Sequence, residues 1–260
     1  MDFSGTRFLI TGGTAGIGYT MALDLVKQGA RVVVCGRDSD RLEALQAVTG
    51  RIKALRCDVR DAQSVLALRD AAVEAYGPPD VLINNAAIFK RYQLADRSVT
   101  MEDWLEELDI NLMGALRVTH ALLPHFLDRG RGTIVNVTSP AAFIPLAAAP
   151  TYSASKAALQ SFTKSLRHQL RDTGVSVIEL NPPAVNTQMN VNNPDVEGMK
   201  LWSLPEFSTH VLARLAQQPG RDILVGDAKL VSRMRRLAPQ LVFNKMNPER
   251  TPKEEVAPMG

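Results

Sequence analysis

A glycine-rich turn near the N-terminus constrains this chain more than any other feature. Residues 11–18 read Thr-Gly-Gly-Thr-Ala-Gly-Ile-Gly, after an apolar run at 8–10 and before a helical pattern over 17–26. Because glycine has no Cβ, such a turn can approach a pyrophosphate closely, and the helix N-terminus offers it free N–H groups. The pattern predicts a strand that turns into a helix at a dinucleotide site, although other glycine-rich loops have similar sequences.

Apolar, β-branched segments alternate with amphipathic ones along the rest of the chain. We expect strands at residues 8–10, 31–35, 52–57, 81–83, 133–137, 175–180 and 223–225. Helices are expected at 17–26, after Asp38 or Ser39, from Asp61 to Tyr76, over 100–127 with room for a break near Asn111, over 151–171 and over 205–217. This alternation predicts a single-domain α/β fold, a doubly wound parallel sheet of Rossmann type with helices on both faces.

Composition excludes several classes of protein. The net charge of +3 comes from 30 basic and 27 acidic residues spread along 260, so no nucleic-acid partner is expected. Cys35 and Cys57 each end an apolar run without a C-x-x-C or histidine partner, which predicts buried reduced thiols and no metal. The N-terminus lacks the pattern of a signal peptide, and no window resembles a membrane span, so we expect a cytoplasmic protein.

The last part of the chain departs from the strand and helix rhythm. We assign residues 1–226 to the dinucleotide domain, including a substrate loop at 188–204, and residues 227–260 to an extension that is partly helical and then mobile. Its apolar stripe consists of Leu230, Met234, Leu237, Leu241 and Val242, beside Arg233, Arg235 and Arg236. Packing on the protein's own body or on another subunit is favoured, and a membrane surface is the alternative.

Two side chains with complementary chemistry lie four residues apart. Tyr152 and Lys156 share one face of the expected helix at 151–171. A neighbouring cation favours the phenolate, so we expect Lys156 to lower the pKa of Tyr152 toward neutral pH. Ser139 follows the fifth expected strand, and the carboxyl ends of parallel strands face the ligand crevice. The three residues therefore predict a site for acid-base chemistry.

Taken together, these motifs carry a family resemblance. The glycine turn, Asn84-Asn85-Ala86-Ala87, Asn111, Ser139 and the Tyr152/Lys156 pair, all in this order, resemble the short-chain dehydrogenase/reductase family over about residues 5 to 226. The resemblance implies hydride transfer between a nicotinamide cofactor and a carbonyl or secondary alcohol. It implies that Tyr152 exchanges a proton with the reacting oxygen and that Ser139 hydrogen-bonds the same oxygen. Lys156 would hold the nicotinamide ribose, and Asn111 would hold a water linking Lys156 to solvent.

The resemblance also implies which residues contact the cofactor. They are Gly12, Thr14, Ala15, Gly16, Ile17, Gly18, Arg37, Asp58, Val59, Asn85, Ala86, Tyr152, Lys156, Pro182, Val185 and Thr187. Gly36 occupies the place where an acid would bind the ribose 2′-hydroxyl, and Arg37 could pair with a 2′-phosphate. NADP(H) is therefore favoured and NAD(H) is the alternative. Asp38 complicates this preference, and Asp58 could instead cap a turn.

Some positions depart from the family pattern. Ala87 replaces the usual glycine of the Asn-Asn-Ala-Gly motif, and Pro183 stands where Pro-Gly normally follows the sixth strand. With residues 166–173, the Pro-Pro motif is similar to the bacterial DltE-like branch, and that branch name does not identify a reaction. Residues 141–146 and 189–204 are mostly apolar and predict a mainly apolar carbonyl or alcohol substrate.

Relatives also suggest assembly. In many of them two long helical regions pair between subunits, here 102–127 and 152–171, so we expect a homodimer or homotetramer. Two other functions stay open. One is a dinucleotide-binding regulatory or scaffold protein with little or no turnover. The other is a lyase or epimerase, which is disfavoured because such relatives commonly have longer chains.

Overall fold

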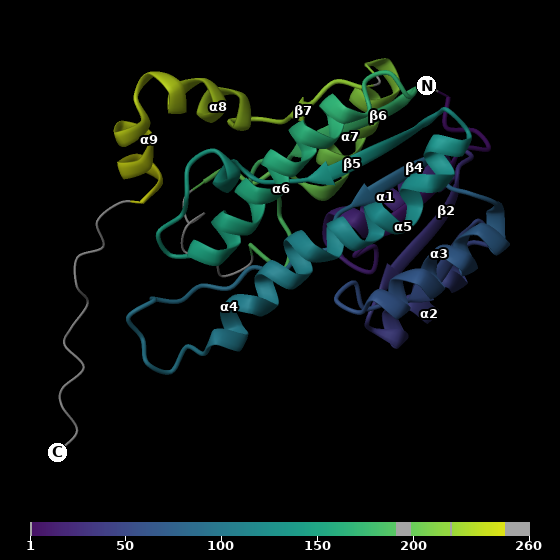
Figure 1. Cartoon of the computed structure of the whole chain (residues 1–260), viewed down its shortest axis with the longest axis horizontal. Helices are drawn as coiled ribbons and strands as arrows, with labels where there is room; N and C mark the ends of the chain where they lie inside the picture. Colours follow the sequence, from purple (N-terminus) through teal and green to yellow (C-terminus); the bar gives the residue numbers. More distant parts are fainter. Residues whose placement is uncertain (1, 191–198, 219, 248–260) are drawn as a thin grey trace.

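The computed structural model describes residues 2–190, 199–218 and 220–247. In this part of the chain, seven strands form one parallel sheet in the order β3-β2-β1-β4-β5-β6-β7 (Figure 1). The strands are β1 (Arg7–Thr11), β2 (Arg31–Gly36), β3 (Ile52–Arg56), β4 (Val81–Asn84), β5 (Gly132–Val137), β6 (Val175–Asn181) and β7 (Ile223–Leu224). Each lies close to an expected strand, and the doubly wound prediction is confirmed.

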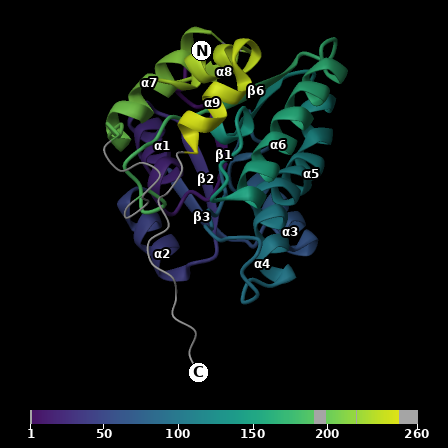
Figure 2. The same cartoon turned by 90° about the vertical axis from the view of Figure 1, so that its left-hand side faces the viewer.

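Helices connect the strands and cover both faces of the sheet (Figure 2). They are α1 (Gly16–Lys27), α2 (Ser39–Val48), α3 (Ala62–Tyr76), α4 (Met101–Leu108), η1 (Asp109–Gly114), α5 (Ala115–Asp128), η2 (Pro140–Ala142), α6 (Pro150–Gln169), α7 (Leu204–Gln217), α8 (Ala228–Leu237) and α9 (Pro239–Met246). Asp61 caps α3, as expected, and Asp38 rather than Ser39 caps α2.

Strand residues alternate between two apolar cores because successive side chains point to opposite faces. Phe8 and Ile10 of β1 pack with α1, α2 and α7, whereas Leu9 packs with α3, α5 and α6. β2 repeats the pattern, with Val34 in the first cluster and Val33 in the second. Burial on both faces explains why the strands are continuously apolar in the sequence. Because β1, β4 and β5 are parallel neighbours, their carboxyl ends meet at one edge of the sheet.

The long helical region at 100–127 is interrupted near Asn111, as the sequence suggested. Thr100 begins α4 with a capping box to Asp103, and η1 is a π-helical turn between α4 and α5. Gly114 lies in this turn, where a Cβ would come within 2.6 Å of Val59 Cγ2. A π-helical turn rotates the residues on its two sides relative to each other. It therefore decides which side chains of this region face the sheet.

The extension packs on the segment that follows β5. Asn247 accepts a hydrogen bond from the Ala147 backbone N–H and donates one to the Pro145 carbonyl. The Arg235 guanidinium lies 4.9 Å from the centre of the Phe143 ring. The expected packing on the protein's own body is thus found for one side of α8 and α9, where Val242 is buried.

Part of the apolar stripe is exposed on this chain, and its packing on another subunit stays a prediction. Leu230, Leu237 and Leu241 are 60%, 80% and 61% exposed. The body offers α8 and α9 only one contact face, so the opposite face of this hairpin remains uncovered. The expected mobile end, residues 248–260, lies outside the described residues. None of the described helices combines the length and apolarity needed to cross a membrane.

Candidate active site

The glycine turn lies against the end of β4. Gly12 has a φ of 64°, and a Cβ on it would come within 2.8 Å of the Ala86 Cα. Gly16 also has a positive φ, 55°. A Cβ on Gly18 would approach the Asn85 side-chain nitrogen to 2.6 Å. These positions require glycine because of backbone conformation or close approach.

Asn85 ties this turn to the sheet. Its side-chain amide donates to the carbonyls of Thr11 and Gly12, both at 3.0 Å. The Thr11 hydroxyl accepts from the backbone N–H groups of Asn85 and Ala86. These hydrogen bonds hold the glycine turn and the segment after β4 together. They also fix the backbone at Ala86.

The N-terminus of α1 fits the pyrophosphate of a dinucleotide. Ala15 precedes α1 and provides no side-chain cap, and the first turn contains no acidic residue. The N–H groups at the start of a helix have no intrahelical partner, and they attract anions. Thr187, on the segment after β6, packs near Gly16: its Cγ2 would lie 3.4 Å from a Cβ there. The predicted cofactor residues Gly12, Gly16, Gly18 and Thr187 are thus brought together.

The end of β2 is basic. Arg37 is exposed, and a Cβ on Gly36 would come within 2.8 Å of the Thr14 Cγ2. The Asp38 carboxylate accepts from the Arg41 backbone N–H at the start of α2 and pairs with the Arg41 side chain. The Asp38 carboxylate, which complicated the preference for NADP(H) in the sequence, is therefore bound at the start of α2.

Asp58 and Val59 follow β3. The Asp58 carboxylate accepts hydrogen bonds from the backbone and the guanidinium of Arg60. These bonds lower the pKa of Asp58 despite partial burial. Val59 is buried against Gly114. The turn-capping interpretation of Asp58 is thus found, and any cofactor contact at these two residues stays a prediction.

Ser139, Tyr152 and Lys156 converge at the end of β5. Tyr152 is 8% exposed and Lys156 is 2% exposed. The Lys156 ammonium lies 5.7 Å from the centre of the Tyr152 ring and donates to the Val137 carbonyl at 2.9 Å. Ser139 hydrogen-bonds the Tyr152 side chain, which lowers the pKa of the phenol, and also accepts from the Ala141 backbone N–H.

The protonation of this group differs from the expectation. Burial raises the pKa of Tyr152 to about 12, and the Ser139 hydrogen bond only partly opposes it. Burial also lowers the pKa of Lys156 to about 8. The predicted lowering of the Tyr152 pKa by Lys156 is not found: burial raises this pKa, and the Lys156 ammonium is bound to the Val137 carbonyl of β5. The helical spacing placed the two residues together but did not reveal their burial.

Asn111 lies in the π-helical turn, next to this group. Its side chain accepts from the Ile88 N–H and donates to the Ile88 carbonyl, at 2.8 and 2.9 Å. It also donates to the Ser155 hydroxyl at 3.2 Å. The side chain therefore joins the segment after β4 to α6. A water held by Asn111 stays a prediction.

Comparison with known proteins identifies the family of this site. The sequence pattern described as short chain dehydrogenase matches residues 6–197. The chain belongs to the short-chain dehydrogenase family. "Uncharacterized oxidoreductase DltE" of Bacillus subtilis (strain 168) is 39% identical over 199 residues, covering 76% of this chain and 79% of that protein. The resemblance to the DltE-like branch is thereby confirmed.

Other relatives and solved structures agree. A putative ketoacyl reductase of Streptomyces coelicolor is 39% identical over 187 residues, covering 70% of this chain and 71% of that protein. The 3-ketoacyl-(acyl-carrier-protein) reductase of Brucella melitensis complexed with NADH has a TM-score of 0.78 and 28% identity, covering 85% and 96% of the two chains. A Burkholderia cenocepacia J2315 short chain dehydrogenase in complex with NADP has a TM-score of 0.82 and 25% identity, covering 95% and 99%.

This short-chain dehydrogenase is accordingly an NAD(P)-dependent oxidoreductase acting on a CH–OH/C=O pair. The Phe89 ring meets that of Tyr152 edge-on, with the ring centres 4.9 Å apart. On the segment after β6, the backbones of Val185 and Trp202 form a short bridge. Pro182 lies buried at the end of β6, and Pro183 packs near Gly226. Residues 191–198 of the predicted substrate loop lie outside the described residues.

Other sequence predictions concern residues away from the site. Cys35 and Cys57 are free and buried, as expected. Within the described ranges, no group of His, Cys, Asp and Glu could hold a metal ion. Sequence reasoning missed Glu107, which is completely buried beside Tyr152. Its signal was a carboxylate four residues before Asn111, on the side of α4 that continues into the buried face of η1.

Proposed function

We propose that this short-chain dehydrogenase transfers a hydride between NADP(H) and a carbonyl or secondary alcohol at Ser139, Tyr152 and Lys156. The observation that carries the proposal is the convergence of the buried Tyr152 and Lys156 with the half-buried Ser139, at the sheet edge that also holds the glycine turn. The alternative, a dinucleotide-binding scaffold with little turnover, lacks an observation in its favour.

The protein's own groups account for the proton chemistry. A bound nicotinamide supplies or accepts the hydride. In reduction, the Tyr152 hydroxyl gives its proton to the carbonyl oxygen, while Ser139 hydrogen-bonds that oxygen. Burial raises the pKa of Tyr152 to about 12 and so keeps the phenol protonated at neutral pH, the state that proton donation to a carbonyl oxygen requires. Lys156 presents a buried cation to the ribose side of the site, and Asn111 holds Ile88 and α6 in register.

The residues of the turn are proposed as the cofactor site. Thr14, Ala15, Ile17, Asn85 and Ala86 would surround the pyrophosphate with the glycines. Asp58 and Val59 would meet the adenine, and Pro182, Val185 and Thr187 would cover the nicotinamide. The cradle of glycines at 12, 16 and 18 supports this assignment.

NADP(H) is the proposed cofactor because of the charges at the end of β2. Arg37 is exposed and forms no ion pair within the described residues, whereas Asp38 is bound to Arg41. A free guanidinium can bind a 2′-phosphate in bidentate fashion. The solved relatives hold NADH in one case and NADP in another, so the preference rests on Arg37.

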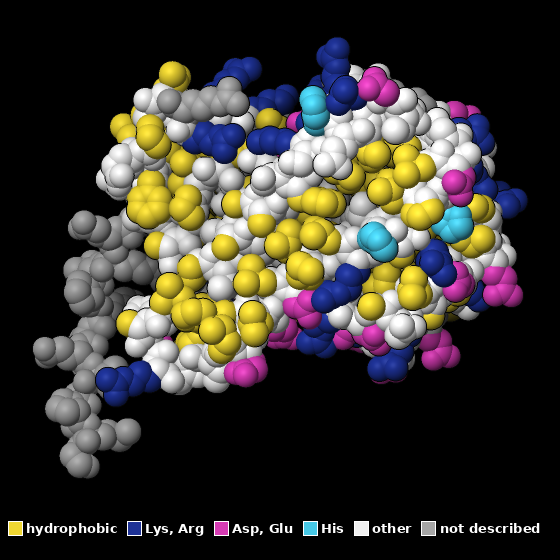
Figure 3. Space-filling view, viewed as in Figure 1, with side chains coloured by type: hydrophobic (Ala, Val, Ile, Leu, Met, Phe, Trp, Pro, Cys, Tyr) yellow, Lys and Arg dark blue, Asp and Glu magenta, His cyan; other side chains and the backbone are white. Residues whose placement is uncertain are grey.

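We further propose a mainly apolar substrate and a homodimer or homotetramer in the cytoplasm. Phe89, Ile144 and Trp202 supply apolar surface on the substrate side. Exposed apolar side chains gather over α4 and η1, namely Leu94, Met101, Leu105 and Met113, between 41% and 59% exposed (Figure 3). A patch of this kind supports pairing of α4 and α5 between subunits. Free buried thiols support a reducing compartment.

The test is oxidation of NADPH and NADH with a panel of ketones and aldehydes, for the wild type and for Tyr152→Phe. We expect turnover with NADPH that Tyr152→Phe reduces by about a hundredfold or more, because a general acid is lost. Unchanged cofactor binding by the variant would show that it is folded. Tight NADPH binding without oxidation by any substrate would favour the scaffold function.

A further inference from the structure

The buried carboxylate of Glu107 lies beneath the N-terminal turn of α6, the turn that carries Tyr152. Its side chain comes from α4 and is 0% exposed. Lys90 donates its backbone N–H to one carboxylate oxygen at 2.8 Å, and the Thr151 hydroxyl donates to the other. Tyr92 hydrogen-bonds the same Thr151 hydroxyl. A fully buried carboxylate with this many donors is held in one position.

The start of α6 requires such an acceptor. Ala149 precedes the helix and has no side-chain cap, and Pro150 occupies the first helical position. The N–H groups of the first turn carry the positive end of the helix dipole. The Glu107 carboxylate accepts a hydrogen bond from the Thr151 hydroxyl, and a hydrogen bond from the Tyr152 backbone N–H stabilises the charged form of Glu107. Its carboxylate therefore replaces the missing N-cap from a different helix.

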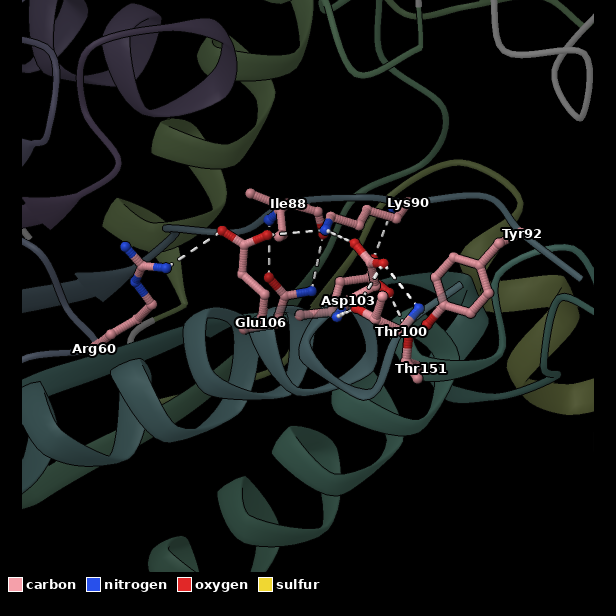
Figure 4. A network of polar contacts seen from close by, with 10 residues as sticks. Arg60, Ile88, Lys90, Tyr92, Thr100, Asp103, Glu106 and Thr151 are labelled. Atoms are coloured by element: carbon pink, nitrogen blue, oxygen red, sulfur yellow. Dashed lines mark hydrogen bonds and ion pairs between the residues drawn. The ribbon is translucent and has the colours of Figure 1, made fainter. Parts of the chain in front are cut away.

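A network of ion pairs among partly exposed side chains lies beside Tyr92 and Thr151 (Figure 4). Lys90 pairs with Asp103 and Glu106, each at 2.9 Å, and Glu106 also pairs with Arg60. These charges are matched among themselves and are partly exposed. Glu106 and Glu107 are thus neighbours in sequence with different environments. This contrast offers a matched control.

We propose that Glu107 is a positioning residue that caps α6 from α4 and places a negative charge beneath the Tyr152/Lys156 pair. The Glu107 charge opposes the effect of burial on the pKa of Lys156 and adds to the effect of burial on the pKa of Tyr152. It raises the pKa of Lys156, against the lowering caused by desolvation. It raises the pKa of Tyr152, in the same direction as desolvation. Both effects keep a proton on the group concerned, which favours carbonyl reduction.

The groups facing Glu107 are few. From the segment after β4 they are Lys90 and Tyr92; from α6 they are Thr151, Tyr152 and Lys156; and Asp103 belongs to its own helix. Desolvation raises the pKa of Glu107, and the hydrogen bond from Thr151, the Lys90 and Tyr152 N–H groups and the Lys90 charge oppose this. The Lys90 ammonium is partly exposed and also pairs with Asp103 and Glu106, whereas Lys156 is buried. Lys156 is therefore the buried cation that depends on Glu107.

The experiment measures the unfolding free energy against pH for the wild type, Glu107→Gln and the control Glu106→Gln. The folded-state pKa of Lys156, about 8, lies below its ordinary 10.5, so the unfolded chain binds more protons between these values. Stability from this group therefore rises with pH from about 8. We expect Glu107→Gln to move the onset of that rise about one pH unit lower, since an opposing charge is lost.

Glu106→Gln should leave the onset where it is in the wild type. An onset that does not move in Glu107→Gln, or moves equally in both variants, overturns the proposal and leaves Glu107 a packing residue. Should Glu107→Gln fail to fold, the double variant Glu107→Gln/Lys156→Met is decisive. Recovery of folding in the double variant supports the charge interaction between Glu107 and Lys156, whereas a persistent failure to fold overturns it and leaves Glu107 a structural cap of α6.

The catalytic meaning of this charge rests on the proposed function. With an active carbonyl substrate, the alkaline decline of the NADPH-dependent rate should move to lower pH in Glu107→Gln and stay in place in Glu106→Gln. The unfolding measurement requires neither cofactor nor turnover. A protein without turnover would thus disprove the proposed function while the shift in stability still tested Glu107.

Discussion

At the scale of single residues, burial decides the chemistry of Tyr152 and Lys156. Both side chains are nearly inaccessible, and desolvation moves the pKa of each group away from its charged form. The phenol of Tyr152 is therefore fully protonated at neutral pH, as the proposed proton donor must be. Lys156 is a cation whose charge is retained only below about pH 8.

This burial predicts an alkaline decline. Lys156 loses its proton as pH rises through about 8, so NADPH affinity and the rate of carbonyl reduction should fall there. The measurement is the Kd for NADPH and the reduction rate as functions of pH. Lys156→Arg stays charged and should remove the decline in affinity, even at a lower rate. A wild-type affinity that is constant far above pH 8 would contradict the prediction.

Arg37 should determine the choice between cofactors. Arg37→Ala removes the guanidinium proposed to pair with the 2′-phosphate, which should raise the KM for NADPH about tenfold, the effect of roughly 1.4 kcal/mol. The KM for NADH should change little, because NADH lacks that phosphate. Arg69→Ala, on the opposite face in α3 and paired with Asp70, is the control. Equal losses for both cofactors would argue against the assignment.

At the scale of secondary-structure elements, polar contacts join the strands and helices that carry the site. The Asp80 carboxylate, just before β4, accepts hydrogen bonds from the backbone N–H and the guanidinium of Arg7 in β1. It also pairs with Arg129 after α5. Burial alone would raise the pKa of Asp80, but the hydrogen bonds and charge of Arg7 outweigh it, so the pKa lies below the ordinary value. These bonds tie the amino ends of β1 and β4 together.

Asp80→Asn should therefore destabilise the fold in a pH-dependent way. At neutral pH we expect a loss of about 1–3 kcal/mol in unfolding free energy, because charge-assisted hydrogen bonds are weakened. The lowered pKa of Asp80 contributes stability above the unfolded pKa, and this is lost as pH falls through the folded value. Denaturation curves of both proteins should thus converge in acid. A difference that is independent of pH would contradict this account.

The end of α9 should hold the segment at 143–147 in place. Asn247→Ala removes the bonds to Pro145 and Ala147 and should cost about 1 kcal/mol of unfolding free energy. Backbone N–H exchange should become faster at residues 143–147 than in the wild type. Asn244→Ala, whose side chain accepts a hydrogen bond from Gln240 within α9, is the control. Equal exchange in the two variants would show that Asn247 does not anchor this segment.

At the scale of the whole molecule, two exposed apolar regions have different neighbours. One lies over α4 and η1, and the other is formed by Leu230, Leu237 and Leu241 of the extension. The first continues along the helices expected to pair between subunits. The second lies beside the segment at 140–147, to which α8 and α9 are attached.

This difference predicts how the protein assembles. Leu105→Glu places a charge within the α4 surface and should convert the proposed dimer to monomers at micromolar concentration, as measured by light scattering. Leu230→Glu is an equally exposed control on α8 and should leave the mass unchanged. A chain ending near Asp227 tests whether the extension limits assembly. Identical masses for the wild type and Leu105→Glu would place the interface elsewhere.

The sequence by itself determined the fold class and named the residues of the candidate site. Continuous apolar runs in the strands, helical spacing between Tyr152 and Lys156 and the glycines at 12, 16 and 18 are local patterns that can be recognised along the chain. The π-helical turn was visible only as an uncertain break near Asn111, because its hydrogen bonds depend on what packs against the helix.

Tertiary structure decided the electrostatics and the partners. The pKa values of Tyr152 and Lys156 depend on desolvation, which no spacing along the chain reveals, and this is why the expected effect of Lys156 was wrong. In the sequence, Glu107 resembles an ordinary surface residue of a helix; the packing of α6 against α4 buries it. Burial and the approach of charges from distant segments are properties of the packed molecule, so the sequence could name the reacting groups but could not give their protonation.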